Sequence, residues 1–350
     1  MSQKPRLATL TLGIGGLLIF LATAAQAGVI YNFTNFNGPG SGNIANTGTN
    51  MNGIANNGAA VGVGISNTGA FTNFVRNPNG TFTTLNINGS TTAMALGINS
   101  GGDVVGTVNA TAFFLPHGGS VQTLTTPGGA TTALGINDMG NIVGQFTSGA
   151  TTPGFYIASS SSLNFITINA PSGPNAVNAQ GVNNNGLIVG FYLGTDGQVH
   201  GFMGLAGNAV GGMLTGTPIA DPTIPSVPGE PGATFVFSQV LGINDHGIAV
   251  GYYGDSTMSQ HGFLYSTHTG QYTFLDDPGE GFDNGVEVTQ ITGITNSGEI
   301  TGFYTDANGI AHGFVAAPVP EPASLTLAGV GLLAAWLAKR KARASMDLHR

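Results

Sequence analysis

Short apolar segments alternate with polar turns along the chain, and one version of this pattern recurs six times. Each copy begins with glycine followed by isoleucine or valine, and further glycines stand five and nine residues later. The copies start near residues 53, 97, 135, 181, 242 and 293, and a phenylalanine follows each of them. Self-similarity at a period of about 40–50 residues is typical of repeat architectures. The framework positions are Gly53, Gly58, Gly62, Gly97, Gly102, Gly106, Gly135, Gly140, Gly144, Gly181, Gly186, Gly190, Gly242, Gly247, Gly251, Gly293, Gly298 and Gly302, with Phe71, Phe113, Phe155, Phe202, Phe263 and Phe314.

Each copy predicts four strands, as the third copy illustrates. An apolar start at 135–136 leads through the polar turn 137–140 into a second strand at 141–146. A third strand follows at 154–157, and residues 163–168 alternate apolar and polar side chains, as in a half-buried strand. Asparagine early in the turn and glycine at its end favour a type I turn closed at positive φ. The glycine nine residues into each copy lies inside a strand, which predicts a bulge or a close backbone approach.

Four strands per copy predict an all-β fold, a six-bladed β-propeller in which each copy forms one blade. The last copy, 293–317, shows only three strands, whereas residues 30–40 resemble the fourth-strand segment 163–173. We therefore expect the N-terminal strand to pair with the last copy and close the ring, which removes exposed strand edges. A β-solenoid is the alternative, and it would not need this displaced strand.

The N-terminus has the three parts of a secretory signal peptide. Lys4 and Arg6 precede an apolar run at 7–24, and a small-x-small site follows. The pattern predicts export through the Sec translocon and a signal peptide at 1–27; a buried first helix is the alternative. An exported chain without cysteine has no disulfides, so its stability must come from burial and hydrogen bonding. The predicted cleavage positions are Ala25, Ala27 and Gly28.

The C-terminus has a second apolar run, at 323–338, followed at once by a basic cluster at 339–343. The run is short for a membrane-spanning helix of about 20 residues, although a thinned bilayer accommodates it. Its basic flank would stay cytoplasmic by the positive-inside rule, which leaves the body of the chain outside. These features predict a single transmembrane helix that tethers an exported protein.

The triplet Pro320-Glu321-Pro322, the apolar run and the basic cluster together resemble the PEP-CTERM sorting signal of exported Gram-negative bacterial proteins. The resemblance implies recognition by exosortase, a membrane-embedded transpeptidase-like protease, and removal of the tail near the triplet. It also implies a final location at the envelope surface or outside the cell, after transient inner-membrane anchoring. A simple tail anchor with a proline-rich stalk is the alternative.

The repeats resemble the HAF family of extracellular repeats through the pattern Gly-Ile-Asn-x-x-Gly-x-x-Val-Gly. The last three copies also carry His-Gly-Phe, at His200, His261 and His312. The resemblance implies an exported location and assigns no activity. Together with the two terminal signals, the repeats divide the chain into a signal peptide at 1–27, a HAF-repeat β-propeller domain at 28–317 and a sorting tail at 318–350.

Composition and charge exclude several classes of protein. Charged residues make up only 7% of the chain and hydrophobic residues 41%, so the chain can bury a core and is not charge-rich disorder. Its 58 glycines follow no three-residue period, which excludes collagen. Between Gly28 and Pro318, fourteen acidic residues stand against one base, Arg76, a net charge of −13. This balance excludes nucleic acid and nucleotide P-loops, and it favours neutral glycans, cations or basic proteins.

Three features carry candidate chemistry, each with a structural alternative. The equivalent histidines His200, His261 and His312 would form a ring of metal ligands, or they pack and stabilise turns within their copies. The proline-rich insertion 215–234 is a functional surface loop or a variable connector. An acidic connection between the last two copies would hold calcium through hard oxygen ligands, or it is a solvated acidic face. Its members are Asp276, Asp277, Glu280, Asp283 and Glu287.

No common catalytic motif occurs in the sequence, and there is no cysteine nucleophile. We therefore expect a non-enzymatic binding or structural protein of the cell surface or extracellular matrix, which needs no cofactor and has a polysaccharide or a matrix protein as partner. The alternative is a polysaccharide hydrolase or lyase that uses two of the carboxylates Asp103, Asp138 and Asp245. Asp138 and Asp245 occupy a turn position that Ser100 and Asn184 fill in other copies, which favours structural use.

Overall fold

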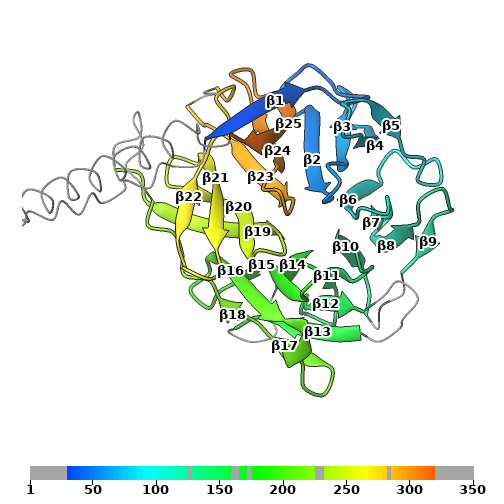
Figure 1. Cartoon of the computed structure of the whole chain (residues 1–350), viewed down its shortest axis with the longest axis vertical. Coiled ribbons are helices and arrows are strands. Elements are labelled where there is room, and N and C mark those ends of the chain that lie inside the picture. The colour runs from blue at the N-terminus through cyan, green and yellow to red at the C-terminus, as the bar shows by residue number, and fades with distance from the viewer. Residues whose placement is uncertain are drawn as a thin grey trace, which may run out of the picture.

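The computed structural model describes residues 30–319, except 125, 127, 159–164, 172–175, 225–231 and 282–284. This part of the chain is all-β, with strands β1 to β25 and one short 3-10 helix, η1 (Ala206–Asn208). Figure 1 shows the strands grouped around a common centre, with β2, β6, β10, β14, β19 and β23 innermost. The predicted signal peptide and all of the predicted sorting tail beyond Val319 lie outside the described residues, and with them Ala25, Ala27, Gly28, Pro320, Glu321 and Pro322.

The strands pair into antiparallel four-stranded units, numbered here 1 to 6 along the chain. Units 1 and 2 comprise β2 (Gly48–Ile54), β3 (Ala60–Ile65), β4 (Phe71–Arg76) and β5 (Phe82–Thr84), then β6 (Met94–Ile98), β7 (Val104–Val108), β8 (Thr111–Leu115) and β9 (Gln122–Thr123). Units 3 and 4 comprise β10 (Thr131–Ile136), β11 (Ile142–Phe146), β12 (Gly154–Ile157) and β13 (Phe165–Asn169), then β14 (Val177–Val182), β15 (Leu187–Leu193), β16 (Val199–Leu205) and β18 (Thr217–Pro218). Units 5 and 6 comprise β19 (Phe235–Ile243), β20 (Ile248–Asp255), β21 (Gln260–Ser266) and β22 (Tyr272–Phe274), then β23 (Thr289–Ile294), β24 (Ile300–Thr305), β25 (Ala311–Pro318) and β1 (Tyr31–Phe36). One further strand, β17 (Met213–Thr215), runs parallel to β13 at the outer edge of unit 3.

The predicted pairing of the N-terminal strand with the last repeat is confirmed. Strand β1 runs antiparallel to β25 from the pair Tyr31↔Pro318 to the pair Phe36↔Gly313. The ring of Phe33 packs edge-on against Phe314, with centroids 5.2 Å apart. A single parallel bridge, Gly48↔Ala311, also joins unit 1 to unit 6. The first and last parts of the body are therefore held together by strand pairing.

The turn between the first two strands of each unit follows the sequence prediction. In unit 3 the Gly140 amide donates to the Asn137 carbonyl, at 3.0 Å, and Gly140 has a φ of +77°. This left-handed conformation favours glycine, because a Cβ would clash with the backbone. The corresponding glycines of the other units also have positive φ: Gly58, Gly102, Gly186, Gly247 and Gly298.

The glycine nine residues into each copy is a close approach, as predicted. A Cβ on Gly144 would collide with the Thr132 carbonyl oxygen and lie 2.7 Å from the ring of Phe155. Phe155 is the cross-strand partner of Gly144 and is fully buried. The same glycine–phenylalanine pairing recurs in the other units, as Gly62↔Phe74, Gly106↔Phe113, Gly190↔Phe202, Gly251↔Phe263 and Gly302↔Phe314.

The structure corrects the predicted phenylalanine of unit 1 and locates the bulge of the repeat. In unit 1 the phenylalanine over the glycine is Phe74, whereas Phe71 pairs with Ile65 at the far end of the strand and is only half-buried. The bulge lies elsewhere than at the glycine nine residues into the copy. It falls in the first strand, just before the opening glycine, as the register shift between Ala133 and Gly135 shows. The same shift occurs in every unit.

The opening glycines bring neighbouring units into backbone contact around the centre. A Cβ on Gly181 would lie 3.1 Å from the Cα of Gly242, and one on Gly242 would lie 3.1 Å from the Cα of Gly293. A Cβ on Gly293 would lie 3.3 Å from the Cα of Gly53, so unit 6 meets unit 1 in the same way. Outside this contact the core lies between units, where apolar clusters combine side chains of adjacent units.

We predict that deleting residues 28–40 lowers the melting temperature by about 10 °C or more. The deletion removes β1, exposes the edge of β25 and uncovers Phe314, and losing a well-packed aromatic contact costs about 3–5 kcal/mol. Thermal unfolding followed by circular dichroism measures the change. Ile30→Ser, at a 70% exposed position beside the strand, serves as control. An unchanged melting temperature after the deletion would contradict the role of β1.

We predict that Gly144→Ala destabilises the fold by roughly 3 kcal/mol, because the added methyl group meets a backbone oxygen that cannot move aside. Gly207→Ala is the matched control, since a Cβ there has nothing within 4 Å; its free energy of unfolding should change by less than about 0.5 kcal/mol. Urea denaturation of both variants measures the difference. Equal stability of the two variants would show that the close approach is not needed.

Candidate functional site

Buried asparagines link the hairpin turns of successive units. The side-chain oxygen of Asn137 accepts hydrogen bonds from the amides of Met139 (3.1 Å) and Asn141 (2.8 Å) in its own turn. Its Nδ2 donates to the Asn183 carbonyl of the next unit, at 2.9 Å. Each such asparagine therefore satisfies its own turn and binds the neighbouring turn. The same link runs from Asn99 to Asn137, from Asn183 to Asn244 and from Asn244 to Thr295.

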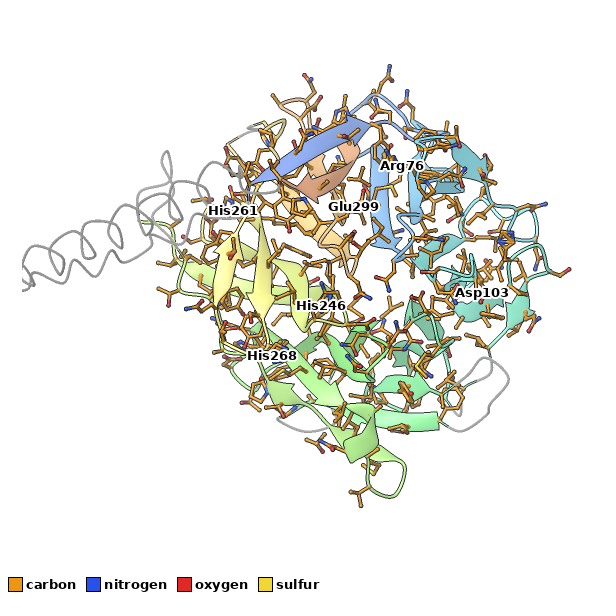
Figure 2. The ribbon with its side chains drawn as sticks, in the orientation of Figure 1. Arg76, Asp103, His246, His261, His268 and Glu299 are labelled. Carbon is orange, nitrogen blue, oxygen red and sulfur yellow. The ribbon has the colours of Figure 1, made fainter. Side chains whose placement is uncertain are left out.

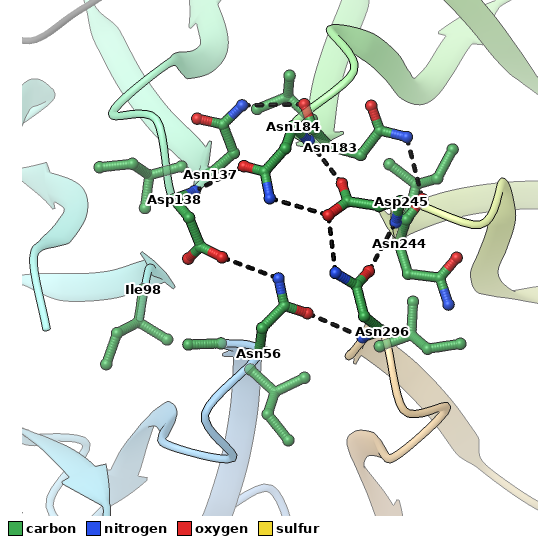
Figure 3. Close-up of a pocket in the computed structure, with 15 residues that line it drawn as sticks. Asn56, Ile98, Asn137, Asp138, Asn183, Asn184, Asn244, Asp245 and Asn296 are labelled. Carbon is green, nitrogen blue, oxygen red and sulfur yellow. Dashed lines mark hydrogen bonds between the residues drawn. The ribbon is translucent and has the colours of Figure 1, made fainter. Parts of the chain in front are cut away.

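A second set of polar residues, which we call the amide ring, follows these asparagines in the sequence. Asp245 accepts hydrogen bonds from the backbone N–H of Asn184 (2.7 Å), from Asn184 Nδ2 (2.9 Å) and from Asn296 Nδ2 (2.7 Å). The ring continues through the Asn296 amide, which donates to Asn56 Oδ1, and through Asn56 Nδ2, which donates to Asp138 at 2.9 Å (Figure 3). Its members are Asn56, Ser100, Asp138, Asn184, Asp245 and Asn296.

The amide ring encloses an axial pocket of about 60 Å³. Below it lies a collar of aliphatic side chains, and a second pocket of about 70 Å³ lies on the other side of the collar. Since a water molecule takes about 30 Å³ of liquid, each pocket has room for about two waters and none for a sugar ring. The collar consists of Ile54, Ile98, Ile136, Val182, Ile243 and Ile294.

The carboxylates of the enzymatic alternative are already engaged by the protein. Asp138 and Asp245 line the same axial pocket, whereas Asp103 faces the outer turn of unit 2, where it accepts from the His117 amide. Figure 2 places Asp103 in unit 2. Burial raises the pKa of Asp138, but hydrogen bonds from Ser100, Asn56 and Asn184 outweigh burial and hold that pKa below its ordinary value. A carboxylate in this state is an acceptor rather than a proton donor.

The three repeat histidines lie in three different units, and each bridges groups of its own neighbourhood. His200 lies between Asp221, 2.8 Å from Nδ1, and Asp196, 3.0 Å from Nε2. Burial lowers the pKa of His200, yet the two carboxylates outweigh burial and raise it above the ordinary value. His261 is buried in unit 5 (Figure 2), 3.0 Å from Asp276. His312 lies 2.8 Å from Asn37 Oδ1.

This geometry matches the packing and turn-stabilising interpretation of the histidines. Each ring also lies against a tyrosine of the adjacent strand, as Tyr304 against His312 with centroids 5.2 Å apart. Among the described residues, no group of three or more His, Asp or Glu side chains is arranged to hold a metal ion. The structure therefore does not bring His200, His261 and His312 together as ligands.

The acidic connection between units 5 and 6 contacts β1 and both units. Asp276 accepts from the Gly262 amide (2.9 Å), and buried Asp277 accepts from Asn35 Nδ2 of β1 (3.0 Å). The Thr289 hydroxyl donates to Glu280, at 2.6 Å. These three carboxylates thus hold the connection, β1 and β23 together. Asp283, the fourth candidate calcium ligand, lies outside the described residues.

The proline-rich insertion begins as part of the fold. Thr217–Pro218 forms β18, which pairs with Phe202 and Met203 and completes unit 4. Asp221 then accepts from the Ser238 hydroxyl (3.2 Å), and the Ala220 carbonyl accepts from Tyr272 (2.8 Å). The first part of the insertion is therefore framework, because unit 4 has no other outer strand. Residues 225–231 lie outside the described part.

Two larger grooves lie between units, each beside the hairpin turn of the following unit. The first groove, of about 510 Å³, separates units 1 and 2 and includes Thr84, Asn86 and His117. The second groove, also about 510 Å³, separates units 5 and 6 and includes His246 and Thr273. Sequence analysis missed both, because each forms only where two units meet, and side chains such as Thr84, Asn86 and Thr273 stand outside the glycine–phenylalanine framework.

Residues 318–341 match the PEP-CTERM protein-sorting motif, and this stretch contains Pro320-Glu321-Pro322. The match implies export and recognition by an exosortase. Of the described residues, none forms a helix that is long and apolar enough to cross a membrane. The predicted tail helix at 323–338 lies outside them.

No curated protein matches the sequence, but several solved structures resemble the fold. TolB from Acinetobacter baumannii has a TM-score of 0.46 at 10% identity, over 80% of this chain and 66% of that chain, just under two thirds. Virginiamycin B lyase from Staphylococcus aureus has a TM-score of 0.41 at 15% identity, over 83% of this chain and 100% of that one. Aleuria aurantia lectin, in complex with α-methyl-L-fucoside, has a TM-score of 0.41 at 13% identity, over 82% and 97%. Likenesses this distant carry no argument about function.

We predict that stability falls as the pH rises from about 4.5 to about 8, and that Glu280→Gln removes part of this fall. Burial, with the charges of Asp276 and Glu287, raises the pKa of Glu280 to about 8. In this pH window the folded chain therefore keeps a proton that the unfolded chain releases. The free energy of unfolding decreases as the pH rises through the window. The variant should melt higher than the wild type at pH 9, by on the order of 2–4 °C for about 1 kcal/mol.

Melting temperatures of both chains at pH 5, 7 and 9 check this prediction. The wild type should lose stability across the window, and the variant should lose less. A difference between the two chains that is the same at pH 5 and pH 9 would contradict the raised pKa.

Proposed function

We propose that this chain is an exported, six-bladed β-propeller that acts without catalysis at the cell surface or in the extracellular matrix. The observation that carries the proposal is the match of residues 318–341 to a protein-sorting motif. In this proposal 1–27 is a signal peptide read by the Sec translocon, 28–317 is the HAF-repeat propeller, and 318–350 is the tail. Exosortase recognises the tail near Pro320-Glu321-Pro322 during transient inner-membrane anchoring.

The contacts of β1 support a closed propeller. Unit 6 obtains its fourth strand from the N-terminal end of the body, and Gly293 of unit 6 contacts Gly53 of unit 1. A ring fastened by its two chain ends is typical of propellers. Each of the six units would then be one blade.

The axial pocket supports a non-catalytic role. A glycosidase needs one carboxyl group that donates a proton and a second one across the scissile bond. The Asp138 carboxyl has a lowered pKa, and a pocket of about 60 Å³ does not admit a sugar ring. The polar residues that line the axial pocket instead form hydrogen bonds between neighbouring units. These features support a binding or structural role, for which we propose an extracellular polysaccharide or matrix protein as partner.

Cell fractionation of the producing bacterium tests the location. The full chain should reach the envelope surface or the medium and become shorter near residue 320, as intact mass shows. A variant with Pro320, Glu321 and Pro322 replaced by alanine should keep its full tail. Deletion of 345–350, beyond the basic cluster, is the matched control and should leave processing unchanged. Equal processing of the alanine variant would overturn the sorting role.

A reducing-end assay on the polysaccharides of the producing cell tests the absence of catalysis. The full chain should release no new reducing ends. Release that is lost on Asp138→Asn or Asp245→Asn would instead establish the hydrolase alternative, and release accompanied by new double bonds would establish the lyase.

A further inference from the structure

The first and second grooves differ from the rest of the body in charge. The body as a whole carries a net charge of −13 between Gly28 and Pro318. Among the described residues that line the two grooves, however, there is no Asp, Glu, Lys or Arg. Each groove has one histidine, His117 in the first and His246 in the second, and otherwise only uncharged side chains. No permanent charge therefore faces a phosphate, a sulfate, a carboxylate or a cation. The lining therefore suits an uncharged ligand.

The first groove combines an aliphatic wall with polar groups that can still donate hydrogen bonds. Val75, Leu85 and Leu115 line it, half-buried, and pack on the core cluster between units 1 and 2. Thr83 shares a strand face with Val75, its cross-strand partner, and its hydroxyl accepts from Asn77 Nδ2 (3.1 Å). The Asn86 Nδ2 makes no hydrogen bond to any described residue, and Asn86 uses only its oxygen, toward Gly89. The side chains of Thr83 and Asn86 are exposed. Free donors above an apolar wall match a molecule with hydroxyl edges and C–H faces.

The second groove repeats this arrangement four units later. Leu264 and Thr273 are cross-strand partners there, as Val75 and Thr83 are in the first groove. Thr273 and Gln271 are exposed, and Leu264 is half-buried on the core of units 5 and 6. The turn of the following unit borders each groove, at Ser100 and at Ser297. Both grooves thus open beside the amide ring, on the same side of the ring of units.

The size of the grooves selects among neutral ligands. Each measures about 510 Å³, within the ~300–1,000 Å³ of small-ligand sites, whereas the axial pocket measures about 60 Å³. A short stretch of sugar rings fits this volume and presents hydroxyls and apolar faces together. Two equivalent sites on one molecule gain most from a repeating ligand, since the second contact is intramolecular.

We propose that the two grooves are binding sites for a neutral polysaccharide, each holding a short stretch of its chain. The inference deepens the proposed function, on which it rests, by naming the ligand class and the residues that bind it. In the first groove the Thr83 hydroxyl and the Asn86 amide donate to sugar hydroxyls, and Val75, Leu85 and Leu115 contact a sugar face. In the second groove Thr273 and Leu264 take the corresponding places.

Calorimetric titration of the full chain in detergent tests the proposal. The probes are neutral oligosaccharides of two to four glucose, mannose, xylose or fucose units, with oligogalacturonate as the charged comparison. Thr83→Arg fills the first groove and Thr273→Arg the second. Gln122→Arg is the matched control, because Gln122 pairs with Phe114 in unit 2 as Thr83 pairs with Val75 in unit 1, and it lines neither groove.

At least one neutral oligosaccharide should bind with two sites per chain, and oligogalacturonate should not bind. Thr83→Arg and Thr273→Arg should each leave one site, the double variant none, and Gln122→Arg two. For a polysaccharide long enough to span both grooves, each single variant should weaken binding at least about tenfold. Binding of no neutral probe, equal binding of oligogalacturonate, or unchanged binding by the double variant would each overturn the proposal.

The outcomes separate this proposal from the proposed function. The double variant keeps the whole tail, so it should be exported and shortened like the wild type in the fractionation. Loss of saccharide binding with normal export supports the grooves as binding sites. Normal export of a wild-type chain that binds no saccharide overturns the grooves alone, and saccharide binding by a chain that stays in the cell overturns the location alone.

Discussion

The approach of six glycine backbones around the centre is the constraint on which the rest of the fold depends. With no side chain at Gly97, Gly181 or Gly242, the first strands of neighbouring units come close enough for a hydrogen bond from one turn to the next. Asparagine fills that role because its amide accepts within its own turn and donates to the next one. A larger residue at any of these glycines would separate two units. The buried side-chain amides of their turns would then lose their hydrogen-bond partners.

The sequence predicts the features that recur and misses those that occur once. The turn glycines are predictable because they recur in all six copies. The pairing of β1 with β25 is predictable because the last copy has only three strands where a comparison with the others predicts four. The choice of Phe71 over Phe74 failed because both residues fit an apolar strand, and only the register against Gly62 separates them. The sequence did not predict β18, because it lies in a proline-rich stretch. Pro218 is tolerated there because β18 is an edge strand. Both grooves escaped prediction because Thr83 and Asn86 stand outside the glycine–phenylalanine framework by which the repeat is recognised.

Scarcity of positive charge decides how this protein uses its carboxylates. Arg76, the one base of the body, lies 5.0 Å from the centre of the Phe36 ring on β1. The acids therefore accept mostly from uncharged amides, hydroxyls and histidines, as Asp245 does from Asn184 and Asn296. Some of these contacts join two units, as at Asp245, and others close a hairpin within one unit, as Asp306 does by accepting from the Ile310 amide.

The pairing of β25 has a mechanical consequence. The chain leaves the body at Val319, whose amide donates to the Ile30 carbonyl at 2.7 Å, and the strand before it has β24 on one side and β1 on the other. Tension on the C-terminal segment would run along β25 and load both ladders in shear, many hydrogen bonds at once, instead of peeling an edge strand bond by bond. A protein held by this end in flowing liquid would therefore resist mechanical unfolding.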